Sequence, residues 1–270
     1  MKRWPKHSLP GSWPLSGQND GVRPLLLVLA GFLSATAIPQ DIRRDLRTRT
    51  PILTYHDVIS LRDANSLWFD CSVDELREQI AWLTKRHATF ITLDQLYNHL
   101  VKGAPLPPHA VVITFADNYL GFYERALPIL VQNHIPAAMF VHTSMVGKAT
   151  GRPKASWPQL QAMQRTGLVT ICSQTVTHPT DLRTLTEAQL DREMRDSKKT
   201  LESQLGVSVK YVAYPNGKWN LASTRTAHRA GYLMGFTEEL RPAETATNIL
   251  AVPRYVHTKY RQAWRESYGR

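Results

Sequence analysis

The sequence predicts an α/β fold built on a mostly parallel sheet, and three observations lead to this prediction. Short apolar runs alternate with amphipathic stretches of helical spacing from Pro51 onward. The run at 110–115 is almost continuously apolar, which is typical of a strand buried on both faces. The 270 residues are enough for a barrel of strand–helix units. We therefore expect a barrel rather than an open sheet, with right-handed crossovers between its strands.

The expected strands are short and mostly apolar. They are 52–55, 90–92, 110–115, 137–141, 168–172, 209–213 and 232–236, followed by a final extended piece at 250–256. Each is bounded by residues that favour turns or helices, and strands separated in this way by helices are typical of parallel sheets.

The expected helices lie between these strands, at 73–86, 93–101, 119–133, 157–166, 186–205 and 221–229. In the first, Leu76, Ile80 and Leu83 share one helical face. In the longest, Thr184 or Thr186 is the expected N-cap and Gly206 the expected end. Internal repeats and low-complexity linkers are missing from the sequence, so we expect one domain over 41–270.

The first 37 residues resemble a secretory signal peptide. A basic leader with Lys2, Arg3, Lys6 and Arg23 precedes a small-or-apolar run at 25–33, and 35–37 fit an A-x-A cleavage site. We expect export to the periplasm or the extracellular space, with cleavage near Ala37. A retained N-terminal membrane anchor is the alternative, although the apolar stretch is shorter than the roughly 20 residues of a spanning helix.

The charge of the chain is basic. Loss of 1–37 removes four Lys/Arg and one Asp, so the formal net charge falls from +11 to +8. A basic surface favours anionic partners, and a cell-envelope surface is one of them. Export and the scattered placement of Lys and Arg argue against nucleic acid as a partner. A plain solvated surface is the simplest interpretation, and the oligomeric state stays open.

Cys71 and Cys172 are the only cysteines. In an exported protein they could form one disulfide, or they could be free and buried. Because there is no CxxC spacing, a metal site in this chain has to be built from His, Asp and similar residues.

Polar side chains directly follow several of the predicted strands. In parallel α/β folds the carboxyl ends of the strands meet at one rim, where ligands bind. The residues expected there are His56, Asp57, Asp117, Asn118, His142, Ser173, Gln174, His178, Asn216 and His257. Together they predict a site for metal or acid–base chemistry on that rim.

Three segments carry a resemblance to a known family. They read ITFADNY at 113–119, followed by ALPIL and IPA; SQTVTHP at 173–179, preceded by WPQL at 157–160; and YPNG at 214–217. In this order they resemble the motifs TFDDGY, SHTVTHP and YPYG of the polysaccharide deacetylases (the NodB-homology family, carbohydrate esterase family 4). YHDV at 55–58 and PRY at 253–255 are similar to the branch that deacetylates poly-β-1,6-N-acetylglucosamine.

The resemblance implies a distorted (β/α)7-type barrel and a metal-dependent amide hydrolysis. In the family a divalent metal, usually zinc, is held by one Asp and two His and activates a water molecule. A second Asp accepts the proton of that water, and a His protonates the leaving amine. The implied metal ligands here are Asp117, His178 and Gln174. The implied substrate-binding residues are Trp157 and the turn Tyr214, Pro215, Asn216 and Gly217.

The departures from the motifs affect catalysis. The position of the general base is Ala116, which cannot accept a proton, and loss of a general base typically lowers the rate by about 10²–10⁴. Gln174 replaces a metal-binding His with a neutral, weak donor, so the zinc affinity is expected to be low or absent. Ala213 stands where some relatives carry an Arg before the third motif, and Arg254, on the last expected strand, is the candidate catalytic residue that supplies this charge instead.

Three hypotheses follow for the function. In the first, the protein is a non-catalytic relative that still binds a polysaccharide containing N-acetylglucosamine. In the second, it hydrolyses that polysaccharide with a rebuilt site, in which Asp57 is the base and His56 the acid beside a metal. In the third, it is a structural or assembly partner in the envelope.

Overall fold

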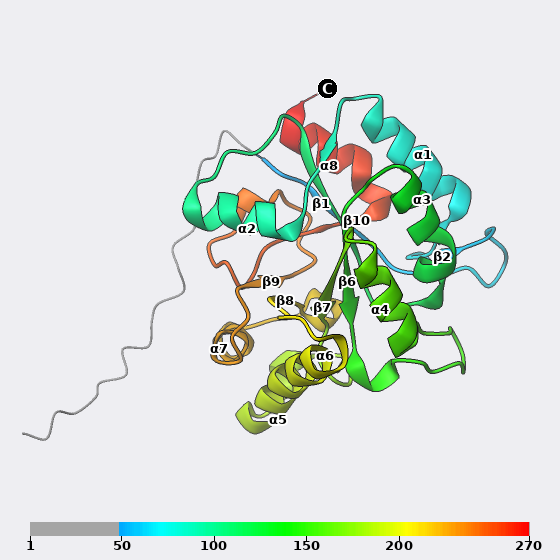
Figure 1. The fold of residues 1–270 in the computed structure, drawn as a ribbon. Helices are drawn as coiled ribbons and strands as arrows, with labels where there is room; N and C mark the ends of the chain where they lie inside the picture. The colour runs from blue at the N-terminus through cyan, green and yellow to red at the C-terminus, as the bar shows by residue number, and fades with distance from the viewer. Residues whose placement is uncertain (1–48, 270) are drawn as a thin grey trace, which may run out of the picture. The chain divides into compact units, whose positions relative to one another are not determined.

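The structure is a computed structural model that describes residues 49–269. The expected signal peptide and its cleavage position lie outside the described residues. The described part of the chain forms strand–helix units around one parallel sheet (Figure 1). None of the helices in this part is long and apolar enough to cross a membrane.

The main sheet has the order β10-β1-β5-β6-β7-β8-β9. Strand β4 pairs with the first two residues of β5. Its strands are β1 (Ile52–Tyr55), β4 (Thr89–Phe90), β5 (Ala110–Phe115), β6 (Ala137–Val141), β7 (Val169–Ser173), β8 (Tyr211–Ala213), β9 (Met234–Phe236) and β10 (Tyr255–Val256). All of their pairings are parallel. Strands β2 (Val58–Ile59) and β3 (Cys71–Ser72) form a separate pair.

The sheet bends toward closure through the segment before β10. Val252 makes a parallel bridge with Phe236 of β9, and β10 then pairs with β1. The backbone N–H of Thr237 donates to the carbonyl of Val252 at 2.9 Å. The two edges of the sheet are therefore linked by one short stretch of chain, which makes the barrel distorted and incomplete.

The helices alternate with the strands along the chain, and α8 follows the last strand, β10. They are α1 (Val73–Thr84), α2 (Leu93–Lys102), α3 (Leu127–Gln132), α4 (Trp157–Arg165), α5 (Glu187–Asp191), α6 (Ser197–Leu205), α7 (Leu221–Arg229) and α8 (Tyr260–Tyr268). Capping boxes begin several of them, as at Ser72 with Glu75 for α1 and Thr92 with Gln95 for α2. Gly206 ends α6 in the left-handed conformation.

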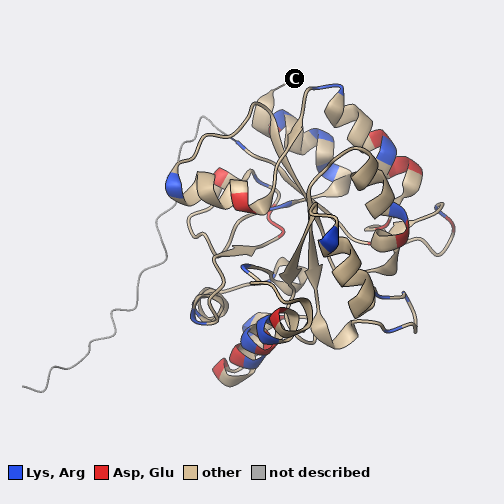
Figure 2. Cartoon of the chain, viewed as in Figure 1, with Lys and Arg blue, Asp and Glu red and all other residues tan. Residues whose placement is uncertain are grey.

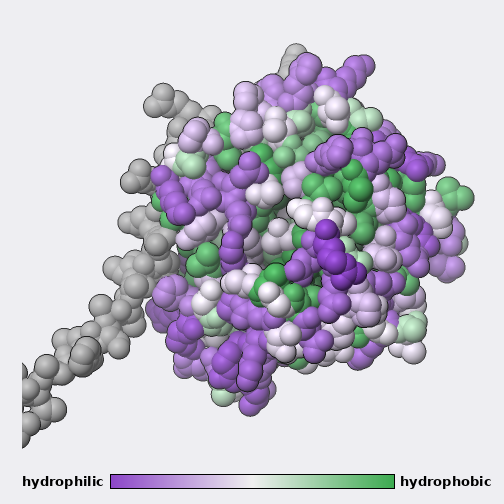
Figure 3. Space-filling view, viewed as in Figure 1, coloured by the Kyte–Doolittle hydropathy of each residue, from purple (hydrophilic) through white to green (hydrophobic). Residues whose placement is uncertain are grey.

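The core is formed by the strands and by the inner faces of the helices. Strands β1, β5 and β6 are buried along their whole length. Charged residues lie on the helices and loops, and acidic and basic residues are mixed along the helical stretch 187–205 (Figure 2). Hydrophilic side chains cover most of the face seen in Figure 3, and the apolar patches between them are small.

Most predicted elements are present with shifted ends. The expected helix 186–205 is one helical stretch that contains a π-helical segment at Arg192–Asp196. Helix 119–133 likewise begins with a π-helical segment, Phe122–Ala126. The expected extended piece 250–256 contains only the two residues of β10 as a regular strand, and helix α8 was not predicted.

Cys71 and Cys172 are both buried and free, and within the described residues they form no disulfide. Of the two possibilities that the sequence left open, the structure therefore has the unpaired one. Burial raises the pKa of the Cys71 thiol and that of the Cys172 thiol, so both remain protonated at neutral pH.

Candidate functional site

The carboxyl ends of four neighbouring strands bring the predicted polar residues to one rim. His56 follows β1, Asp117 follows β5, His142 follows β6 and Gln174 follows β7. The chain turns sharply at each point. Asp117, Thr175 and His178 all have positive φ angles, of 66°, 70° and 55°, a conformation that is unfavourable for residues with a Cβ. Such strain costs about 1–3 kcal/mol per residue and is concentrated at functional sites.

Asp117, Gln174 and His178 are in direct contact. Oε1 of Gln174 accepts the backbone N–H of Asp117 at 2.8 Å, which fixes the orientation of the amide. Its Nε2 then faces Nε2 of His178 at 3.2 Å. Since an amide nitrogen only donates, His178 Nε2 is the acceptor of this hydrogen bond.

The same atom of His178 lies 3.4 Å from Oδ1 of Asp117. The two contacts compete, because Nε2 cannot accept from the amide and donate to the carboxylate at once. We assign the hydrogen bond to the shorter contact with Gln174. Consistent with this, Asp117 Oδ1 is buried and has no hydrogen-bond partner among the described residues.

These three side chains do not fit a family-type metal. A zinc ion needs the lone pair of an imidazole nitrogen and usually three protein ligands. Here the lone pair of His178 Nε2 and the carbonyl oxygen of Gln174 both take part in hydrogen bonds. Within residues 49–269, no three His, Cys, Asp or Glu side chains gather closely enough to hold a metal.

Asp117 is supported by two residues that its motif does not contain. Its backbone carbonyl oxygen lies 2.9 Å from Nζ of Lys154 and 3.1 Å from Nε2 of His142. Burial acts to raise the pKa of the Asp117 carboxyl, but the positive potential of the surrounding groups, Lys154 among them, outweighs it, so this pKa lies well below its ordinary value. The carboxylate is therefore ionised at neutral pH.

Sequence reasoning missed Lys154 altogether. It lies in the irregular segment before α4, and burial lowers its pKa to about 8. Its ammonium also lies 3.3 Å from the centre of the Tyr119 ring, a cation–π contact. No periodicity or motif marks such a residue, so the sequence contained no signal that would have identified it.

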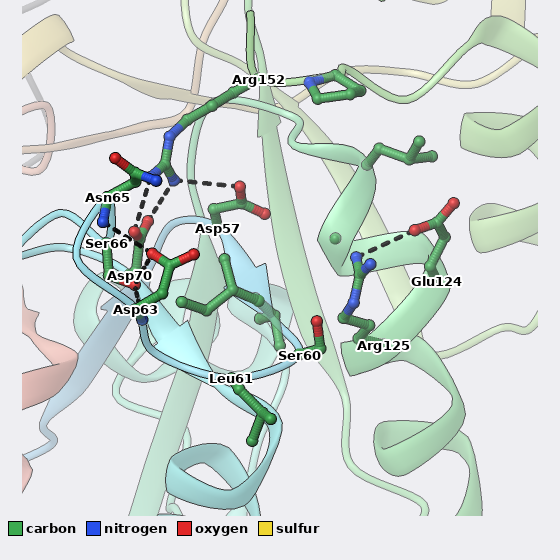
Figure 4. A pocket seen from close by; sticks show the side chains of 15 residues that line it. Asp57, Ser60, Leu61, Asp63, Asn65, Ser66, Asp70, Glu124, Arg125 and Arg152 are labelled. Carbon is green, nitrogen blue, oxygen red and sulfur yellow. Dashed lines mark hydrogen bonds and ion pairs between the residues drawn. The ribbon is translucent and has the colours of Figure 1, made fainter.

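Asp57, the expected base of a rebuilt site, is paired with an arginine. Its Oδ2 accepts from Nη1 of Arg152 at 3.2 Å, and the same guanidinium forms a two-pronged ion pair with the buried Asp70 (Figure 4). The carboxylate also lies against Gly121, where a Cβ would be only 2.3 Å from Asp57 Oδ1. Asp57 thus anchors a loop, and burial raises the pKa of its carboxyl.

His56, the expected acid, lies near a carboxylate that was not predicted. Its Nε2 is 3.9 Å from Oε1 of Glu238, and Nη2 of the fully buried Arg254 is 3.8 Å from the same oxygen. Burial lowers the pKa of His56, against the opposing effect of Asp117 and Glu238. Arg254 donates to the carbonyl of Thr237 at 3.0 Å, so it links the last strand to the end of β9.

The turn at 214–217 has a structural role. Tyr214 is fully buried, and its hydroxyl donates to the carbonyl of Leu250 at 2.7 Å. Gly217 has a φ of +65°, and a Cβ on it would be 2.7 Å from the backbone nitrogen of Glu238. Pro215 is also buried, so of the four residues expected to bind substrate here, Tyr214 and Pro215 are inaccessible in this structure.

The remaining predicted residues have mixed positions. Asn216 has a φ of +54°, is exposed and donates from its amide to the carbonyl of Thr180 at 3.2 Å. Trp157 begins α4 and packs partly against the core. Ala116 is completely buried, and its N–H donates to the carbonyl of Tyr55 at 2.8 Å.

Comparison with known proteins gives the class of this fold and site. The family model for polysaccharide deacetylase matches residues 103–235. The chain is 30% identical over 199 residues to the poly-beta-1,6-N-acetyl-D-glucosamine N-deacetylase of Staphylococcus aureus (strain MSSA476), covering 69% of this chain and 67% of that protein. The chain belongs to the polysaccharide deacetylase family, whose members are typically metal-dependent.

Two solved structures have the same fold. The deacetylase PplD of Streptococcus pyogenes, solved with acetate, superposes with a TM-score of 0.73 at 24% identity, covering 85% of this chain and 99% of that one. IcaB from Ammonifex degensii gives 0.72 at 24% identity, covering 82% and 97%. The expected distorted (β/α)7-type barrel is thereby confirmed.

Proposed function

We propose that this protein binds an N-acetylglucosamine-containing polysaccharide of the cell envelope and hydrolyses it poorly or not at all. The relative from Staphylococcus aureus is named for its action on poly-β-1,6-N-acetyl-D-glucosamine, which makes a polymer of this type the first ligand to test. The proposed ligand site is the rim around Asp117, His178 and His56.

One observation carries the loss of hydrolysis, namely the position of the Gln174 amide. It joins the Asp117 backbone to His178 Nε2 by hydrogen bonds of 2.8 and 3.2 Å. A metal ion would have to break the second bond to reach that nitrogen, and it would then find only one imidazole and one carboxylate as strong ligands. A site of this composition favours its internal hydrogen bonds over a divalent cation.

A second feature supports the same proposal, because no free carboxylate replaces the missing base. Ala116 has no acidic group, and Asp57 is held by Arg152 at 3.2 Å. Glu238 is the remaining acidic side chain near His56, but it lies 3.8 Å from the Arg254 guanidinium. Among residues 49–269, the rim therefore lacks a carboxylate beside Asp117 that is free of a cationic partner.

The location in the envelope is part of this proposal. The basic leader, the apolar run and the A-x-A site at 35–37 support export with cleavage near Ala37. N-terminal sequencing of the chain recovered from the exported fraction tests this directly. A full-length N-terminus in a membrane fraction would favour the retained anchor instead.

The proposal is tested by measuring binding and acetate release on the same β-1,6-linked N-acetylglucosamine oligomers. We expect saturable binding by the parent protein, with no acetate release above background in the presence of zinc. The double variant Ala116→Asp/Gln174→His restores a base and an imidazole, so we expect it to release acetate at least about 100-fold faster. Rapid acetate release by the parent that a chelator abolishes would establish the rebuilt hydrolase instead. Absence of both binding and release would favour a structural role.

A further inference from the structure

The loop between β2 and β3, residues 60–70, exposes large apolar side chains. Leu61 is 71% exposed, Trp68 67% and Leu67 43%. In Figure 1 this loop extends outward beside β2. Exposed apolar side chains gathered on one segment are typical of a contact surface.

Trp68 is the outer member of an aromatic series that reaches the rim. Its ring lies 5.7 Å from Phe69 in an edge-on arrangement, and Phe69 stacks on Tyr119 with centroids 6.3 Å apart. The Phe69 ring also lies 5.2 Å from His56. We call Trp68, Phe69 and Tyr119 the aromatic ledge. It runs from solvent to the residues that follow β1 and β5.

The loop is held in place by polar contacts rather than by burial of its apolar tip. The guanidinium of Arg152 is bidentate on Asp70, whose Oδ2 also accepts the N–H of Leu67 at 2.6 Å. Arg62 donates to the carbonyl of Asp70 at 2.5 Å and to Glu75 at 2.7 Å. Because the loop is already ordered, a ligand that stacks on Trp68 loses little free energy to ordering it.

Figure 4 shows a polar cavity of about 380 Å³ that Arg152 helps to line. The guanidinium of Arg152 lies 5.4 Å from the centre of the Phe69 ring, so the cavity and the ledge share this neighbour. Its lining combines hydroxyl, amide and carboxylate groups, from Ser60, Asp63, Asn65, Ser66 and Glu124 among others. Its volume is within the range of small-ligand sites. Groups of this kind hydrogen-bond to sugar hydroxyls, and flat aromatic rings pack against the apolar faces of pyranose rings.

We propose that the aromatic ledge and this cavity form a subsite for a neutral N-acetylhexosamine ring of the polymer, adjacent to the rim. This inference rests on the proposed function. It adds the position of the part of the polymer that extends beyond the rim. The lining disfavours an anionic lipid headgroup because its acidic groups outnumber its basic ones. Its two guanidinium groups, of Arg125 and Arg152, are both engaged in ion pairs with lining carboxylates, and Asp63 adds a further negative charge.

The test compares Trp68→Ala with Leu67→Ala, a truncation of an exposed side chain in the same loop that does not line the cavity. Binding of a β-1,6-linked N-acetylglucosamine oligomer is measured by titration calorimetry, and the melting temperature of each variant is checked against the parent. Because Trp68 is mostly exposed, we expect an unchanged fold and about tenfold weaker binding for Trp68→Ala. Leu67→Ala is expected to bind as the parent does, and Trp68→Phe to retain most of the affinity.

Three outcomes would overturn the inference, and they are distinguishable. If the parent does not bind the oligomer, the proposed function fails together with the subsite. If Trp68→Ala binds as tightly as the parent, the subsite is wrong while the proposed function stands. If oligomer binding is unchanged but both Trp68→Ala and Leu67→Ala lose co-sedimentation with phosphatidylglycerol vesicles, the loop contacts a lipid surface and no sugar.

Discussion

Gln174 and His178 lie four residues apart, and the strained turn between them brings their side chains to 3.2 Å. That both would lie near Asp117 was predictable, since each follows a strand of one parallel sheet. That the amide oxygen would accept the N–H of Asp117 was not, because this bond depends on the turn geometry of residues 57 positions apart. The sequence therefore predicted the composition of the site but not its hydrogen bonding.

Asp57 was expected to be a general base, but in the structure its carboxylate forms an ion pair with Arg152. The sequence placed it correctly after β1, next to His56. Its partner Arg152 is 95 residues away in an irregular segment, and no local pattern could reveal that pairing. The ion pair turns a candidate base into a loop anchor.

We predict that Arg152→Ala destabilises the protein by about 2–3 kcal/mol, because it leaves the buried Asp70 carboxylate without its cation. Because Arg152 is partly exposed, the loss of unfolding free energy is expected to lie at the lower end of the range for removal of one partner from a buried ion pair. Urea unfolding measures the free energy. Arg125→Ala is the control, since Arg125 lines the same cavity but pairs with the exposed Glu124, and its loss is expected to change the stability by less than about 0.5 kcal/mol. Equal effects of the two substitutions would refute the anchoring role.

At the scale of elements, the turn after β8 shows why a motif residue need not touch substrate. Tyr214 is buried against the Leu250 carbonyl, and Gly217 allows the close approach of Glu238 at the end of β9. The turn therefore holds two strand ends together and positions Glu238 near His56. Sequence reasoning identified the turn and assigned it to substrate binding, but spacing alone did not reveal that Tyr214 and Pro215 are buried. Substrate binding by Asn216 and Gly217 stays a prediction.

Gly217→Ala is predicted to destabilise the protein more than Gly151→Ala. Both glycines have φ near +70°, so both substitutions incur the same backbone penalty of about 1 kcal/mol. Only at Gly217 would the new Cβ also meet backbone atoms, 2.7 Å from the nitrogen of Glu238, whereas Gly151 has nothing within 4 Å. Thermal unfolding of the two variants isolates the steric contribution, and an equal loss of stability would show that the close approach is unimportant.

At the scale of the whole molecule, the alternation of buried strands and amphipathic helices was sufficient to predict the parallel barrel. The parts that were missed depend on distant contacts. Barrel closure requires Val252 to bridge Phe236, and helix α8 has a mainly polar sequence whose buried residues include Ala263 and Trp264. The loop at 60–70 carries neither periodicity nor a motif, so Trp68 was overlooked in favour of Trp157.

Whether the Gln174 amide excludes a metal ion from His178 can be measured as the zinc content of the purified full chain, after incubation with excess zinc and gel filtration. The hydrogen-bonded arrangement of Asp117, Gln174 and His178 predicts that the parent retains no stoichiometric zinc, whereas Gln174→His retains it. Gln161→His, an exchange outside the site, is the matched control and is expected to behave as the parent does. If the unmodified protein retains one zinc ion per chain and substitution of His178 abolishes this retention, the hydrogen bonds of Gln174 do not exclude the metal.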